Sequence, residues 1–227
     1  MKINIKESFL SPFKSPGWLV KMLIGGALFI VPILNFFSMG YLMRVFKNAI
    51  FKGEKQLPNW DDFGSLFIQG LFVALIGMAY FLPIILVIFI GLMFQVVIPA
   101  IGALIWILTS SVASCIAFAM PFIIGRYLET GKFQSIFDVH IIFNNIKHVI
   151  VDYLKVFLLL LIVNILSVII LGLIPGIGLF LWFFVMFYIG IVFFNIWGEL
   201  YPVSQTQDVS IKAGQETVNA KPGNKDN

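Results

Sequence analysis

The acidic pair Asp61 and Asp62 is the first group of residues whose type and spacing could support chemistry. Two neighbouring carboxylates supply too few oxygen ligands for a caged cation. A capping role is simpler, because Pro58 cannot lie inside a helix and Asn59 is a good N-cap residue. Carboxylates in the first helical turn then complement the positive end of the helix dipole. We expect Trp60 to anchor the same turn at the membrane interface.

A second interpretation of the acidic pair involves Arg44. One carboxylate, on Asp61 or Asp62, would pair with Arg44 and tie the end of the first membrane element to the start of the next long helix. Such coupling would make the effects of substituting both partners non-additive. The sequence does not decide between helix capping and an ion pair with Arg44.

His148 and Asp152 form a second group, because they lie one helical turn apart if this segment is a helix. That spacing suits a pair of metal ligands or an acid–base pair, but His140 is badly placed to join them. The exposed face of an amphipathic helix explains these residues more simply.

Three serines, Ser110, Ser111 and Ser114, form a third group, but their apolar stretch holds no histidine or lysine that would activate a nucleophile. Small residues one turn apart instead favour close packing between helices. We therefore expect no catalytic, cofactor-binding or metal-binding residues, no cofactor, and a protein that is not an enzyme.

The composition places these residues in a membrane. Hydrophobic residues make up 60% of the chain and charged residues 11%, outside the range of soluble globular proteins. The net charge of +4 does not indicate nucleic-acid binding, because the basic residues form no patch and lie between apolar runs. The single cysteine, Cys115, excludes an internal disulfide.

Two long stretches carry no charged residue, Phe63–Gly125 and Val156–Gly198. A straight helix over the first would run about 95 Å, whereas the hydrocarbon core of a bilayer is about 30 Å thick. Each stretch must therefore cross, turn and cross back, with turns predicted at Pro99 and Pro175. The expected fold class is all-α: a polytopic membrane bundle of five to six helices arranged as proline-turn hairpins, with amphipathic interfacial helices.

The apolar run Met22–Met43 has two interpretations. Its length fits one crossing, whereas a re-entrant hairpin at Pro32 would place all 15 lysines and arginines on one side of the membrane. We favour the hairpin slightly. Residues 1–201 are then a single membrane domain that begins with an interfacial segment, residues 1–16, and residues 202–227 form a polar tail that we expect to be disordered.

The distribution of positive charge also predicts orientation. Lysine and arginine concentrate in segments 44–62 and 126–150 and in the tail, so we expect these to face the cytoplasm from the cell membrane. Within the apolar stretches the polar residues are uncharged, for example Gln69, Thr109 and Asn164. They would line a solute path or join helices by hydrogen bonds, and the lack of ionisable partners argues against ion-coupled transport.

A pair of short motifs carries a family resemblance. A Gly-Tyr-x-x-Arg segment is followed about a dozen residues later by Leu-Pro-x-Trp-Asp-Asp. The region 23–71 is similar to domain-of-unknown-function family 4013 of prokaryotic membrane proteins, which implies a multi-helix membrane fold and no known activity. The residues of these motifs singled out as a candidate structural or interaction motif are Gly40, Tyr41, Arg44, Pro58, Trp60, Asp61 and Asp62.

Two functional classes remain from the sequence. The first is a non-enzymatic membrane scaffold that binds partner proteins or lipids of the bilayer. The second is a small permease or channel component, which would be a homo-oligomer because so few helices enclose a narrow path. A water-filled cavity reaching Gln69, Thr109 and Asn164 would favour transport, and a dry packed bundle would favour scaffolding.

Overall fold

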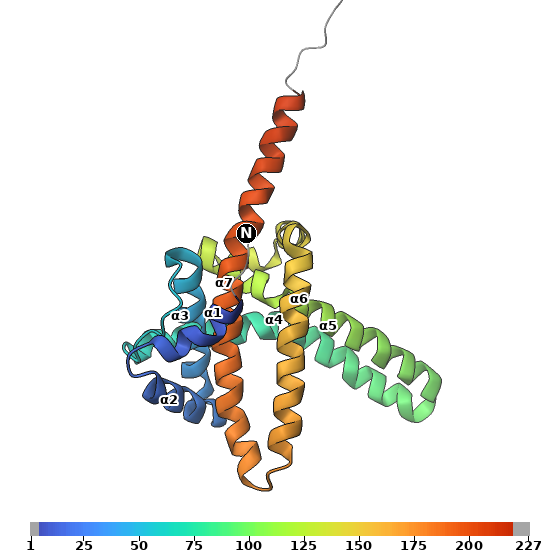
Figure 1. Ribbon diagram of the computed structural model, residues 1–227. Coiled ribbons are helices and arrows are strands. Elements are labelled where there is room, and N and C mark those ends of the chain that lie inside the picture. Colours follow the sequence, from blue (N-terminus) through green and yellow to red (C-terminus); the bar gives the residue numbers. More distant parts are fainter. Residues whose placement is uncertain (1–4, 220–227) are drawn as a thin grey trace, which may run out of the picture.

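The computed structural model describes residues 5–219, and helices account for nearly all of that range, with no strand in it (Figure 1). The elements in chain order are α1 (Ile5–Leu10), the short 3-10 helix η1 (Ser11–Lys14), α2 (Trp18–Ile30), α3 (Asn35–Lys52), α4 (Phe63–Val97), α5 (Pro99–Thr130), η2 (Phe133–Phe137, also 3-10), α6 (Val139–Gly172) and α7 (Ile177–Asn219). The predicted all-α class is confirmed.

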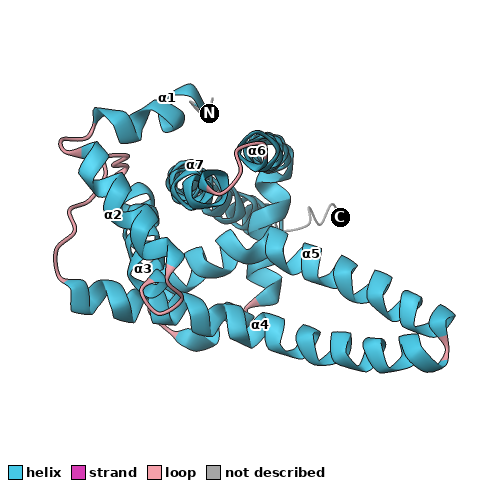
Figure 2. Ribbon diagram, turned by 90° about the horizontal axis from the view of Figure 1, so that it is seen from below, coloured by secondary structure: helices cyan, strands magenta, loops and turns pink. Residues whose placement is uncertain are grey.

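Four of these helices are long and apolar enough to cross a membrane, and they form two hairpins. Helices α4 and α5 meet at Ile98, where Pro99 opens α5 with the fixed φ that suits a first helical turn. Helices α6 and α7 meet at a short turn that contains Gly176 at a φ of +77°. Both proline turns therefore lie where the sequence predicts them. The two hairpins leave the bundle in clearly different directions (Figures 1 and 2).

Helix α4 is longer than one membrane crossing needs. Helix α4 has 35 residues, about 52 Å at the helical rise, against about 30 Å of hydrocarbon. Its first half packs into the bundle, where Leu66 and Ile76 are fully buried. Its far end projects outward, and Val96 is 85% exposed. Helix α4 stays continuous through Pro83.

The N-terminal apolar run is broken rather than a single crossing. Helix α2 ends at Ile30 and α3 begins at Asn35, and the Ser38 hydroxyl on α3 donates to the Gly25 carbonyl on α2 at 2.8 Å. The chain before α2 also touches the loop after α3, because the Leu57 amide donates to the Ser15 hydroxyl at 2.8 Å. Both ends of the run therefore lie on the same side of the helix bundle, as the hairpin interpretation requires.

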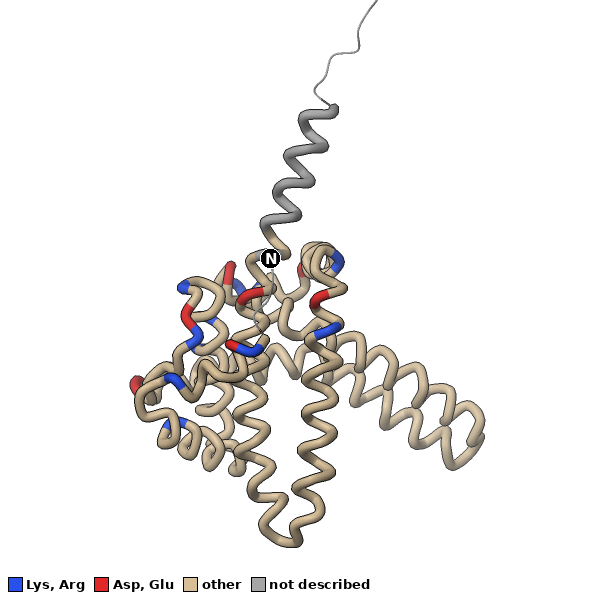
Figure 3. Tube along the Cα trace, in the orientation of Figure 1, with Lys and Arg blue, Asp and Glu red and all other residues tan. Residues whose placement is uncertain are grey.

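The core lies at the base of the two hairpins, where α3, α4, α5, α6 and α7 come together. Its largest fully buried side chains are aromatic, among them Tyr41, Phe46, Tyr153 and Trp197. The rings of Tyr153 and Trp197 join α6 to α7, with centroids 3.9 Å apart. The tips of the hairpins carry no charge, and the charged residues gather around the base (Figure 3).

Helix α7 differs from the sequence-based expectation at its C-terminal end. A disordered tail is predicted from residue 202, but α7 continues as a helix to Asn219. A preformed helix extends easily, because adding a residue avoids the cost of nucleation. Residues 220–227 lie outside the described residues, and the domain boundary at residue 201 stays a prediction.

Candidate functional site

The loop from Gly53 to Asp62 holds most of the motif that the sequence singles out. Gly53 ends α3 at a φ of +65°, a conformation that glycine adopts without strain. The loop is largely irregular, so its backbone carbonyls lack the regular partners of a helix and need others. Side chains of α2 and α3 supply these partners.

Tyr41 and Arg44 lie one turn apart on α3 and face the loop together. The Tyr41 hydroxyl donates to the Pro58 carbonyl at 2.8 Å, and the Arg44 guanidinium donates to the Asp61 carbonyl at 3.2 Å. From α2, the Lys21 ammonium donates to the Leu57 carbonyl at 2.9 Å. The loop is thereby fastened to the α2–α3 hairpin.

The two aspartates have different roles. The Asp61 carboxylate forms an ion pair with Arg44. Its side chain is 67% exposed, so water screens the pair and its contribution to stability is small. Asp62 is the N-cap of α4, and its carboxylate accepts from the Ser65 amide at 3.3 Å. The prediction that Asn59 caps this helix is therefore wrong, because the chain enters the helix three residues later.

Trp60 packs inward on the loop. Its ring stacks on Tyr41 with centroids 4.3 Å apart and planes 14° from parallel, and its indole donates to the Lys21 carbonyl at 3.0 Å. Burial raises the pKa of the Tyr41 hydroxyl, and the neighbouring Arg44 charge only partly opposes this shift. Tyr41 therefore remains neutral and keeps the proton that it donates to Pro58.

Gly40 of α3 completes the set. A Cβ at this position would lie 1.8 Å from the Leu66 carbonyl oxygen of α4, so only glycine allows the two helices to approach this closely. The structure thus brings Gly40, Tyr41, Arg44, Pro58, Trp60, Asp61 and Asp62 into one region. Their polar groups are used to hold a loop and cap a helix.

The comparison with family models bears on this motif. A model described as a protein of unknown function, DUF4013, matches residues 24–176, about two thirds of the chain. The chain belongs to the DUF4013 family. A search of curated proteins and a search of solved structures found no match.

The DUF4013 chain has a second polar cluster that sequence reasoning missed. Arg126, near the end of α5, donates to Asp138 at 3.0 Å and to Glu129 at 3.1 Å. Glu129 also accepts from the Tyr201 hydroxyl at 3.1 Å, which joins α5 to α7. A hollow of about 480 Å³ adjoins the cluster and includes Lys132. The spacing of Arg126 and Glu129 is the only local signal for it, since Asp138 and Tyr201 are distant in sequence.

A third polar contact joins the loop to the first and the last helix. The Lys55 ammonium pairs with Glu199 of α7 and lies 3.7 Å from Glu7 of α1. This contact could not be predicted from the sequence, because the three residues come from three separate segments. It holds α1 against the base of the bundle.

The histidine group predicted as the face of a helix lies on α6. Asp152 pairs with Lys155 at 3.2 Å, and the His140 ring contacts the Asn144 amide at 3.2 Å. Within residues 5–219, no three residues among histidine, cysteine, aspartate and glutamate are grouped as a metal ion would need.

Three uncharged polar residues of the spanning helices make separate hydrogen bonds. Gln69 donates to Ser65 at 2.7 Å and Thr109 donates to the Ile105 carbonyl at 2.6 Å, both within one helix. Asn164 donates to the Met186 sulfur at 2.9 Å and so joins α6 to α7. The three residues lie on different helices and do not share a hydrogen-bond network.

Proposed function

We propose that this DUF4013 protein is a non-enzymatic membrane protein that binds lipids and partner proteins and uses its charged base as the face for partner proteins. The observation that carries this proposal is that Gln69, Thr109 and Asn164 lie on different helices and form three separate hydrogen bonds. A solute path would need such groups directed at one shared cavity. Transport is therefore the less favoured alternative.

The ion pairs at the base support a role as a binding face. Pairs from Arg44, Lys55 and Arg126 join the N-terminal hairpin, the loop and helices α5 to α7. Among the described residues, Lys132 and Lys147 are exposed and lie outside these pairs, so a partner could reach them. Exposed charges on a fixed surface speed association with a partner of complementary charge.

Purification in mild detergent tests the partner-binding part. The full chain is captured from its native membranes, and the proteins that co-purify are identified by mass spectrometry. Lys132→Glu combined with Lys147→Glu should remove a specific partner while the unfolding temperature stays unchanged. Lys132→Arg with Lys147→Arg is the matched control, because it keeps the charge and should keep the partner.

A flux assay addresses the alternative. The purified chain is reconstituted in vesicles, and entry of small uncharged solutes is followed by vesicle swelling. The proposal expects the same rate as in empty vesicles. Faster swelling that Asn164→Ala abolishes would establish a permease and overturn the proposed function.

A further inference from the structure

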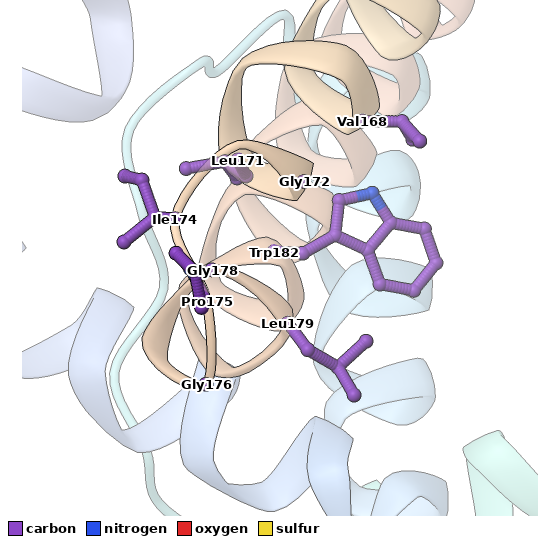
Figure 4. A pocket seen from close by; sticks show the side chains of 9 residues that line it. All are labelled: Val168, Leu171, Gly172, Ile174, Pro175, Gly176, Gly178, Leu179 and Trp182. Carbon is purple, nitrogen blue, oxygen red and sulfur yellow. The ribbon is translucent and has the colours of Figure 1, made fainter.

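The turn between α6 and α7 borders an open apolar pocket of about 370 Å³ (Figure 4). One stripe of α6 and one stripe of α7 line it together with the turn itself. The six helical residues are Val168, Leu171, Gly172, Gly178, Leu179 and Trp182. The turn that lines the pocket lies at the end of the hairpin farthest from the charged base (Figures 1 and 3).

Trp182 places an unused hydrogen-bond donor in this apolar setting. Its indole nitrogen is covered by surrounding atoms and has no acceptor within the described part of the chain. In Figure 4 the ring lies between Val168 and Leu179, with the nitrogen on the Val168 side. An N–H group without a hydrogen-bond acceptor raises the free energy of the protein in hydrocarbon. An apolar ligand with a hydrogen-bond acceptor would remove this cost by accepting from the indole.

The position of the pocket along the hairpin indicates which acceptor is present. Lys155 is the last charged residue of α6, and Pro175 follows 20 positions later, a rise of about 30 Å that equals the hydrocarbon thickness. The turn thus reaches the opposite boundary of the bilayer, where the ester carbonyls of glycerolipids lie. Trp182 is in the second turn of α7, so its ring lies within about two helical turns of that boundary.

Both hairpins bring their helices into close contact at the turn, since a Cβ on Gly178 would lie 1.8 Å from the Leu171 carbonyl oxygen. The α4–α5 turn differs in the side chain that lies between its helices. A Cβ on Gly102 would lie 2.5 Å from the Gln95 side-chain oxygen, so the glutamine occupies the space between the two helices. Trp106 stands seven residues after Pro99, as Trp182 does after Pro175, but its side chain is 43% exposed. The two turns therefore form an internal comparison.

We propose that the α6–α7 pocket binds a glycerophospholipid of the leaflet opposite the charged base. One acyl chain occupies the apolar space, and the adjoining ester carbonyl accepts a hydrogen bond from the Trp182 indole. This site deepens the lipid-binding part of the proposed function and is independent of the partner face at the base.

Photo-crosslinking tests the site in the full chain. The protein is reconstituted in phosphatidylethanolamine and phosphatidylglycerol vesicles with a small fraction of phosphatidylcholine that carries a diazirine near the start of one acyl chain. Mass spectrometry then maps the lipid adducts. We expect clearly more adducts over residues 168–182 than over residues 95–106. Equal labelling of the two turns would overturn the proposal without any variant.

Two pairs of variants sharpen the test. Trp182→Phe keeps a ring but removes the donor and should lower the adducts about threefold, the value of one hydrogen bond inside a membrane, whereas Trp106→Phe should change nothing. A Cβ on Gly172 meets no atom within 4 Å, so Gly172→Leu should fill the pocket and lower labelling to that of residues 95–106. Gly172→Ala is its control and should label like the wild type. Full labelling of Gly172→Leu would contradict the proposal.

Two further readouts separate the remaining outcomes. If a second copy of the chain covers the pocket instead, Leu179→Cys in a Cys115→Ser background will form a disulfide between two chains, and adducts at the turn will be absent. The variant with Lys132→Glu and Lys147→Glu should keep its lipid adducts. Loss of partner capture alone therefore counts against the charged face, and loss of adducts alone counts against this site.

Discussion

The carbonyl oxygen of Leu66 lies 1.8 Å from the position that a Cβ on Gly40 would occupy. The contact is reciprocal, because a Cβ on Gly70 would lie 1.8 Å from the Phe36 carbonyl oxygen. Helices α3 and α4 therefore meet backbone to backbone over one turn. This contact joins the short N-terminal hairpin to the first long helix, and it depends on two glycines.

Gly40→Ala is expected to destabilise the protein by about 1–3 kcal/mol, because the new methyl group forces the two backbones apart. Thermal unfolding in detergent measures the loss. Gly77→Ala is the matched control on α4, since a Cβ there meets no atom within 4 Å. The control should unfold at the wild-type temperature or higher. Equal stability of the two variants would show that the helices do not touch in this way.

Arg44→Ala should cost more stability than Asp61→Ala. Arg44 also donates to the Asp61 and Asn59 backbone carbonyls, whereas the exposed Asp61 carboxylate is worth about 0–1 kcal/mol. The double variant should lose less than the sum of the single losses, because the two side chains interact.

Asp62→Ala provides the contrast to Asp61→Ala. Loss of this N-cap should cost about 1 kcal/mol and add to the effect of Arg44→Ala, because Asp62 does not share the ion pair. Thermal unfolding of all single and double variants distinguishes these cases. Strict additivity for Arg44 and Asp61 would leave the capping of α4 as the role of the acidic pair.

Cysteine labelling checks the orientation. In a Cys115→Ser background, cysteines replacing Glu54 and Lys212 should react with a membrane-impermeant reagent only after cells are opened. A cysteine replacing Ile174, which is 43% exposed at the α6–α7 turn, should react from outside intact cells. The physical reason is the confinement of basic residues to the base and their absence from the turns. Labelling of Lys212→Cys only from outside would reverse the predicted topology.

Truncation after Gln205 should leave folding and stability unchanged, because few apolar residues follow it. Gln205 itself is kept, since its amide donates to Glu129 at 2.7 Å. Accumulation in the membrane and the unfolding temperature are the measurements. A second truncation after Tyr201 removes that contact and should lower the unfolding temperature. Failure of the longer chain to accumulate would show that the end of α7 is required.

The sequence alone determined the membrane class, the two long hairpins and their turns. These features follow from runs without charge that exceed the bilayer thickness and from proline and glycine at the breaks. The motif of Tyr41, Arg44, Trp60 and the aspartates was also visible, because its spacing is local. Its detail was not: Asp62 rather than Asn59 caps α4, since the exact start of a helix depends on how the loop packs.

Only the tertiary structure decided how the N-terminal run folds, because length and charge give opposite answers there. The contact between Ser15 and Leu57 places both ends of that run on one side. The same holds for the cluster around Arg126 and for the pocket at Trp182. The Arg126 cluster includes Tyr201, which lies 72 positions beyond Glu129. The pocket at Trp182 is formed by residues of two facing helices. Contacts between distant segments leave no periodic pattern in the chain, so only packing reveals them.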